Sequence, residues 1–217
     1  AFTNIPENDW HYYLQYRKRQ GYNVLQINIL PQWDASGTDL NYVPYVLKED
    51  GGYDFTKIND DYFQHAKRMC EIAKEYNFEL ALVALWCNYV PKTWANNMLP
   101  FDCVDRYIEK VDETFTQFNP IYIISGDTDL NEEITRNYYN KASDLLREAA
   151  PQCIQTLHVR GRLMEIPEEM INRMDFYMFQ SGHNAKTENL CMTYRLPEYF
   201  VENYPGKPLI NSEPCYE

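Results

Sequence analysis

Two kinds of hydrophobic pattern alternate along the chain. In the first, apolar residues recur at helical spacing, as Val104, Ile108, Val111 and Phe115 do, which predicts amphipathic helices. In the second, short apolar runs with little polar alternation predict strands that are covered on both faces. The helical pattern predicts helices over residues 8–19, 59–76, 101–118, 132–149, 167–174 and 196–203, and the short runs predict strands over 23–29, 78–86, 121–124, 154–159, 176–180 and 208–212. Asn8 or Asp9 is expected to cap the first of these helices.

The regular alternation of helix and strand favours a parallel sheet with right-handed crossovers, either an open doubly wound sheet or a barrel. An open nucleotide-binding sheet would carry a glycine-rich turn after its first strand. The residues after Ile29 begin Leu-Pro-Gln-Trp-Asp instead and offer no phosphate cradle. The long stretch 31–52 is rich in aromatic and turn residues, and we expect a functional loop there.

Polar side chains at the carboxyl ends of the strands favour the barrel, because (β/α)8 barrels build their active sites from those ends. We therefore predict an α/β fold, a TIM (β/α)8 barrel that is incomplete in this chain and lacks its first and eighth strands. Residues 1–217 are expected to form a single barrel domain that is part of a longer protein. The strand-end residues are Gln26 and Asn28, Trp86 and Asn88, Asp127, His158 and Arg160, Gln180 and His183, and Glu213.

The composition narrows the choice of partner. The 217 residues carry a formal net charge of -12, so a phosphate backbone or an anionic membrane surface would be repelled. No apolar run approaches the roughly 18 residues needed to cross a bilayer, and we expect a soluble protein that neither inserts into a membrane nor binds nucleic acid. The 19 Tyr and 4 Trp suit stacking against sugars, although core packing explains most of them.

The cysteine and histidine spacings argue against a metal site. The cysteines form no C-x-x-C pair and fall within periodic segments, which favours buried small side chains over disulfides. The histidines form no i, i+4 pair, so we predict neither a metal nor a cofactor. The residues concerned are Cys70, Cys87, Cys103, Cys153, Cys191 and Cys215, with His11, His65, His158 and His183.

Asp127 and Glu213 are the candidate catalytic residues, because each follows an apolar strand directly. Hydrolysis of a glycosidic bond needs one carboxyl group to protonate the leaving oxygen and a second to attack the anomeric carbon or to activate water. Taken singly, Asp127 also fits a turn aspartate and Glu213 a solvated glutamate, but their joint position at strand ends favours catalysis. Glu217 is a rival to Glu213, which we prefer because a strand end is more rigid than the loop that follows it.

The other strand-end residues and the nearby aromatic residues are candidates for binding substrate. Trp33 and Trp86 can stack on a sugar face, and Tyr89 and Tyr216 can supply both an aromatic face and a hydroxyl, although packing in the core or anchoring a loop is an equal alternative. Amide and imidazole groups can hydrogen-bond sugar hydroxyls, and arginine can bind an acidic sugar. The predicted substrate-binding set is Gln26, Asn28, Trp33, Trp86, Asn88, His158, Arg160, Gln180, His183, Tyr216 and Glu217.

With these motifs laid out, the chain resembles the apiosidase-like glycoside hydrolase family, a group of barrel proteins that is frequent in gut Bacteroidetes. The resemblance covers most of the chain and is most specific in its last two motifs. The motifs are Gly21-Tyr22-Asn23-Val24-Leu25-Gln26, Ala84-Leu85-Trp86, Ile124-Ser125-Gly126-Asp127, Gln180-Ser181-Gly182-His183 and Asn211-Ser212-Glu213-Pro214-Cys215-Tyr216-Glu217.

The resemblance implies a (β/α)8 fold, a secreted, periplasmic or cell-surface location, and hydrolysis of complex glycans, with apiose-containing pectin as one family substrate. It also implies that Asp127 is the acid/base and Glu213 the nucleophile of a retaining mechanism. Three features depart from the family pattern: Ser125 stands in place of a second glycine, the Gly-Asp-Thr motif of the first strand is missing from this chain, and so is the eighth strand.

We therefore predict a glycoside hydrolase that acts on an oligosaccharide or polysaccharide through two carboxyl groups. Two other classes stay open. Ser125 and the missing strands favour a non-catalytic glycan-binding barrel. An open α/β enzyme that uses a nucleotide or a metal would need a glycine-rich loop or a ligand cluster, and the sequence has neither. The sugar, the linkage and the oligomeric state stay undetermined by the sequence.

Overall fold

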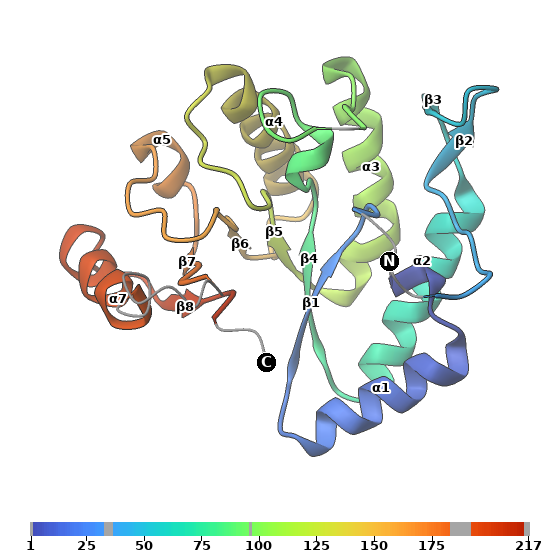
Figure 1. Ribbon diagram of the computed structural model, residues 1–217, viewed down its shortest axis with the longest axis horizontal. Coiled ribbons are helices and arrows are strands. Elements are labelled where there is room, and N and C mark those ends of the chain that lie inside the picture. The colour runs from blue at the N-terminus through green and yellow to red at the C-terminus, as the bar shows by residue number, and fades with distance from the viewer. Residues whose placement is uncertain (1, 33–36, 96, 183–191, 215–217) are drawn as a thin grey trace.

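The computed structural model describes residues 2–32, 37–95, 97–182 and 192–214 (Figure 1). Its elements alternate between helices and strands, as the hydrophobic pattern predicts. In chain order they are η1 (Phe2–Asn4), α1 (Glu7–Arg19), β1 (Val24–Asn28), β2 (Tyr45–Leu47), β3 (Tyr53–Ile58), α2 (Asp60–Glu75), β4 (Glu79–Val83), η2 (Cys87–Tyr89), η3 (Phe101–Cys103), α3 (Val104–Phe115), η4 (Thr116–Phe118), β5 (Ile121–Ile123), α4 (Glu133–Ala149), β6 (Gln155–Thr156), α5 (Glu168–Ile171), β7 (Tyr177–Phe179), α7 (Met192–Asn203) and β8 (Leu209–Asn211), where η marks a short 3-10 helix.

Apart from β2 and β3, the described strands lie in two parallel sheets that follow one another in chain order. A four-stranded sheet has the order β1-β4-β5-β6, and β7 pairs with β8 in a second sheet. In place of a ladder, single hydrogen bonds join the two sheets: the Asp175 amide donates to the Gln155 carbonyl at 2.9 Å, and the Thr156 hydroxyl to the Phe176 carbonyl at 2.9 Å. The predicted parallel α/β architecture is confirmed, and the described residues do not close into a barrel (Figure 1).

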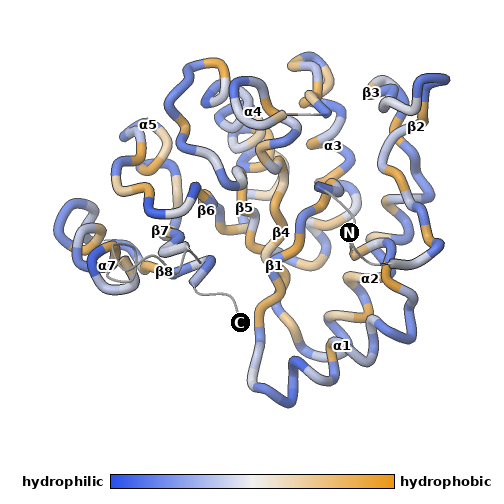
Figure 2. The backbone as a smooth tube through the Cα atoms, viewed as in Figure 1, coloured by the Kyte–Doolittle hydropathy of each residue, from blue (hydrophilic) through white to orange (hydrophobic). Residues whose placement is uncertain are grey.

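The parallel sheets have two different faces. The face toward the helices belongs to the main core, to which Leu80 and Leu82 of β4 contribute, whereas the opposite face carries a smaller apolar cluster. Successive strand residues point to opposite faces, so Gln26 of β1, in register with Ala81, faces the side of the small cluster. Figure 2 shows the hydrophobic segments concentrated along the central strands. The small cluster consists of Ala81, Val83, Ile123, Phe176 and Met178, with Trp86 and Ile121 packed against it.

The ends of the helices follow local chemistry, with two corrections. The Asn59 side chain accepts a hydrogen bond from the Asp61 amide at 3.2 Å and caps α2 as predicted. At α1 the capping position is Pro6, without a side-chain cap, so the expectation of a cap at Asn8 or Asp9 was wrong. The predicted start of the last helix at Leu196 was also wrong, because proline favours a first turn, yet Pro197 lies inside α7.

A β-hairpin occupies part of the stretch that the sequence predicted as loop. β2 pairs with β3 in antiparallel fashion, and the buried Tyr45 packs against Phe55 with ring centroids 4.8 Å apart. The Asn59 side-chain amide donates to the Val43 carbonyl at 2.9 Å and ties the hairpin to the start of α2. The stretch is therefore a folded extension beside α2 and α3 (Figure 1).

The described cysteines are free thiols: Cys70, Cys87 and Cys153 are buried and Cys103 is partly buried. Burial raises the pKa of Cys70 to about 12, so this thiol stays protonated. Cys191 and Cys215 lie outside the described residues. Among the helices that the structure describes, none is both long and apolar enough to cross a membrane.

Candidate active site

The site lies at the carboxyl ends of the strands from both sheets. Asp127 follows β5 and His158 follows β6 in the four-stranded sheet, whereas Gln180 and Glu213 follow β7 and β8 in the second sheet. The chain directions of the parallel strands bring these ends to one edge. Asp127 is partly buried, and the Glu213 side chain is 19% exposed.

His158 links the two predicted catalytic residues. Its Nδ1 accepts a hydrogen bond from the backbone amide of Asp127 at 3.2 Å. Its Nε2 lies 3.4 Å from the Glu213 Oε2 atom, just outside hydrogen-bond geometry. The ring is 0% exposed, so the contact between the two strand ends runs through the protein interior.

Gln180 and the end of β8 hold Glu213 from a second direction. The Gln180 Nε2 atom donates a short hydrogen bond to Glu213 Oε2, and the Gly182 amide donates to the Glu213 carbonyl at 3.2 Å. Beside them, the Ser181 amide donates to Asn211 Oδ1 at 3.3 Å and the Asn211 amide group donates to the Ser181 hydroxyl at 2.9 Å. Glu213 is therefore fixed through both its side chain and its backbone.

Asp127 has an unusual backbone conformation. Its φ angle is 48°, in the left-handed region that aspartate tolerates better than most residues. The preceding residue, Gly126, lacks a side chain and so leaves room for the close approach of another group. The close approach is made by the Trp86 indole, because a Cβ atom at Gly126 would lie 2.1 Å from the indole Cε3 atom.

Ser125 and Trp86 surround the His158 residue. The Ser125 hydroxyl donates to the His158 carbonyl at 2.8 Å, so the serine that departs from the family pattern joins the ends of β5 and β6. The Trp86 and His158 rings have centroids 5.3 Å apart at 41°. The indole N–H of Trp86 is buried, with no hydrogen-bond partner among the described residues.

The charge of Asp127 contributes to raising the pKa of two neighbouring groups, Cys87 and Tyr139. Burial and, next, the Asp127 carboxylate raise the pKa of Cys87 above its ordinary value. Burial raises the pKa of Tyr139 well above its ordinary value, with smaller contributions from Cys87 and Asp127. Both groups therefore stay neutral, and the Cys87 thiol does not compete with the carboxylates as a nucleophile.

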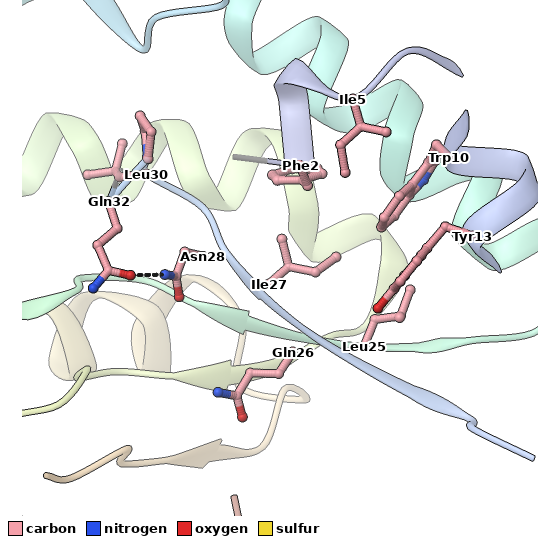
Figure 3. Close-up of a pocket in the computed structure, with 11 residues that line it drawn as sticks. Phe2, Ile5, Trp10, Tyr13, Leu25, Gln26, Ile27, Asn28, Leu30 and Gln32 are labelled. Carbon is pink, nitrogen blue, oxygen red and sulfur yellow. Dashed lines mark hydrogen bonds between the residues drawn. The ribbon is translucent and has the colours of Figure 1, made fainter. Parts of the chain in front are cut away.

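Gln26 and Asn28 line a pocket of about 390 Å³ along β1. Figure 3 shows Gln26 pointing away from Trp10 and Tyr13, which lie on the helix side of the strand. The Asn28 side-chain amide donates to Gln32 Oε1 at 3.4 Å (Figure 3). Both predicted residues thus face the side of the sheet where the small apolar cluster lies, and their roles in binding stay predictions.

Other predicted residues occupy different environments. Asn88 is only 2% exposed, within η2, so direct contact with a sugar would need local opening. Tyr89 is buried and its hydroxyl donates to the Pro31 carbonyl at 2.5 Å, a loop-anchoring contact. Arg160 is exposed, with its Nε atom 3.7 Å from Asp129 Oδ2. Trp33, His183, Tyr216 and Glu217 lie outside the described residues.

Sequence reasoning missed several residues that support the site. Asn211 belongs to the same motif as Glu213, and its polar side chain at a strand end was a usable signal. Gly161 allows close approach of Gln180, because a Cβ atom there would lie 2.6 Å from Gln180 Oε1. No local pattern marks that glycine. In the described part of the chain, no group of three or more His, Cys, Asp or Glu residues could hold a metal ion.

The chain is similar in fold to solved glycoside hydrolases. It is 22% identical to a glycoside hydrolase family 5 protein from Bacteroides vulgatus, with a TM-score of 0.75. The match covers 98% of this chain and 46% of that protein's chain. A second glycoside hydrolase is 24% identical, with a TM-score of 0.71, and the match covers 98% of this chain and 49% of that protein's chain. An endo-1,4-beta-mannanase from Rhizomucor miehei is 12% identical, with a TM-score of 0.57 and coverage of 82% and 64%.

These likenesses support the TIM-barrel type of fold, and the chain spans about half the length of the first two structures. No curated protein matches the chain. A family model described as "Apiosidase-like, catalytic domain" matches residues 1–217.

Proposed function

The chain belongs to the apiosidase-like catalytic domain family, and from this premise we propose that it hydrolyses glycosidic bonds with Asp127 and Glu213. The observation that carries the proposal is the convergence of the two residues on His158. One ring nitrogen is 3.2 Å from the Asp127 amide and the other is 3.4 Å from the Glu213 carboxylate. Glycosidases with a barrel-type sheet use two carboxyl groups at the carboxyl-terminal edge of the strands to cleave the glycosidic bond.

In the proposed mechanism Asp127 is the acid/base and Glu213 the nucleophile. A Glu213 oxygen attacks the anomeric carbon while Asp127 gives its proton to the leaving oxygen, so the glycosidic C–O bond breaks as a glycosyl ester forms. Asp127 then takes a proton from water, and the water oxygen attacks the same carbon. The ester bond breaks, Glu213 leaves as a carboxylate, and the sugar retains its anomeric configuration.

The surroundings of Glu213 suit a nucleophile. A carboxylate attacks only in its ionised form, and hydrogen bonds donated to that form favour it. Gln180 donates one such bond, and the His158 Nε2 atom lies close to the same oxygen. The partly exposed Trp86 beside Asp127 offers an aromatic face for a sugar ring.

The proposed substrate class is a complex glycan of the pectic type that contains apiose. Its support is the family membership alone. Among structures of similar fold, one is called a mannanase and another an endoglucanase, which makes mannan and cellulose oligosaccharides useful comparisons. We further propose that the protein acts in the periplasm, at the cell surface or outside the cell, which fractionation of cells that produce it would test.

The test is to measure sugar release from apiose-containing pectic, mannan and cellulose oligosaccharides by the wild-type protein and by Asp127→Asn and Glu213→Gln. Each substitution should abolish release and leave the circular dichroism spectrum unchanged. Asp129→Asn is the matched control, because it makes the same chemical change on a solvent-exposed carboxylate that pairs with Arg160. Full activity in either test variant would remove that residue from the mechanism. Binding of an oligosaccharide without release by the wild-type protein would favour the glycan-binding alternative.

A further inference from the structure

The His158 side chain is wholly buried between the ends of strands that belong to different sheets. Its exposure is 0%, so a sugar does not reach it without rearrangement of its neighbours. The sequence predicted that this histidine binds substrate. Its position between the Asp127 backbone and the Glu213 side chain suits a different task.

The hydrogen bond from Asp127 determines which ring nitrogen carries the proton. Nδ1 accepts from the Asp127 amide at 3.2 Å, and an accepting ring nitrogen must hold a lone pair. In the neutral ring the hydrogen is then on Nε2, the atom that faces Glu213. The backbone of one carboxylate residue thus orients a donor toward the other carboxylate.

The Nε2 atom is not satisfied in the way that a purely structural histidine would be. It is buried without a hydrogen bond of good geometry in the described part of the chain, and an unsatisfied buried donor destabilises the folded state. The distance to Glu213 Oε2 is 3.4 Å. Hydrogen bonds in catalytic sites are often long in the free enzyme and shorten when substrate is bound.

Neighbouring groups contact both the backbone and the ring of His158. The Ser125 hydroxyl holds the His158 carbonyl at 2.8 Å, and the Trp86 ring lies against the imidazole. Around this cluster, the titratable groups that face the ring are Asp127 and Glu213, with the Cys87 thiol next to Asp127.

We propose that His158 is a positioning residue that fixes the Asp127 turn through Nδ1 and orients the Glu213 carboxylate through Nε2–H during hydrolysis. This inference rests on the proposed function. It assigns His158 no contact with substrate. It accounts for the burial of the ring, for the tautomer and for the unsatisfied donor together.

Two substitutions separate the two halves of the proposal. His158→Gln can retain a donor near the Nε2 position, and His158→Asn can retain an acceptor near the Nδ1 position. A misplacement of about 1 Å costs on the order of 100-fold in rate, so His158→Ala should lower kcat by about that factor on apiose-containing pectic oligosaccharides, with KM nearly unchanged. His11→Gln is the control, because it makes the same chemical change on a partly exposed ring in α1, which carries none of the predicted site residues.

The pH profile distinguishes positioning from mere support of the fold. A donor to an ionised carboxylate lowers its pKa. Loss of the donor in His158→Ala and His158→Asn should therefore move the acidic limb of kcat/KM to higher pH, whereas His158→Gln should keep it near the wild-type position. An unmoved limb in all three variants, or kcat equal to wild type in His158→Ala, would overturn the proposal.

A measurement on the wild-type protein needs neither substrate nor a stable variant. Two-bond ¹H–¹⁵N spectra of protein labelled in histidine report the tautomer of each ring. In its neutral form the His158 ring should show a protonated Nε2 and an unprotonated Nδ1, and Glu213→Gln should shift its Nε2 signal. The opposite tautomer would refute the inference. If Asp127→Asn and Glu213→Gln abolish hydrolysis but His158→Ala does not, the inference fails and the proposed function stands.

Discussion

Gly126→Ala tests how tightly the site is packed. An added Cβ atom would lie 2.1 Å from Cε3 and 2.6 Å from Cδ2 of the Trp86 indole. Since carbon atoms pack best at about 3.5–4.0 Å, the indole and the Gly126 backbone must separate by about 1.4 Å or more. Overpacking of this kind costs about 1–3 kcal/mol of unfolding free energy.

The displacement should also reach the catalytic residues. The Trp86 ring lies 5.3 Å from the His158 ring, and Gly126 directly precedes Asp127. We therefore expect kcat/KM on apiose-containing pectic oligosaccharides to fall by about 100-fold, the usual cost of a misplacement of about 1 Å. Urea unfolding measures the stability, and sugar release measures the activity.

A double-mutant cycle isolates the steric cause. Trp86→Ala removes the atoms that the new Cβ atom would meet, so Gly126→Ala should cost much less in the Trp86→Ala background. A coupling of about 0.5–3 kcal/mol is typical of residues in contact. If Gly126→Ala is as stable as wild type, or equally harmful with and without the indole, the packing argument is wrong.

Two further predictions concern stability. Burial lowers the pKa of His65, against weaker opposing effects of the Thr3 carbonyl and Glu7, so the unfolded chain binds this proton first and stability should fall as pH drops through about 6.5. Urea midpoints at two pH values should differ less in His65→Gln than in wild type, and an equal difference would contradict the assignment. Asn59→Ala removes the cap on the Asp61 amide and the hydrogen bond to the Val43 carbonyl, whereas Asn59→Ser loses the bond to Val43 but keeps a capping oxygen. Asn59→Ala should therefore cost about 1 kcal/mol more than Asn59→Ser, and equal losses in the two variants would argue against capping.

The strands and the two catalytic candidates were predictable because their signals are local. Apolar runs such as those of β4 and β5 are too hydrophobic for an exposed face, and Asp127 and Glu213 follow their strands directly. The hairpin of β2 and β3 was missed because its burial depends on Tyr45 packing against residues of the neighbouring strand. A period of two over such short strands gives little signal of its own.

The supporting contacts were out of reach for a different reason. The orientation of the His158 ring depends on an amide 31 residues away in sequence, and the close approach at Gly126 depends on the indole of Trp86, which belongs to a different segment. Such features follow from the register between elements, which no single segment encodes. A glycine in a sequence signals a need for space or for an unusual dihedral angle, and here the need was space.

The division of the parallel strands into two sheets separates the two predicted catalytic residues. Asp127 follows a strand of the four-stranded sheet, and Glu213 follows a strand of the β7–β8 pair. Isolated hydrogen bonds, such as those from Asp175 and Thr156, cross the seam between the two. Regions with few mutual bonds open at lower free energy than the whole protein. We therefore expect the spacing of the two predicted catalytic carboxylates to depend on the contacts across this seam, and a rise in temperature that loosens these contacts should stop sugar release before either sheet unfolds.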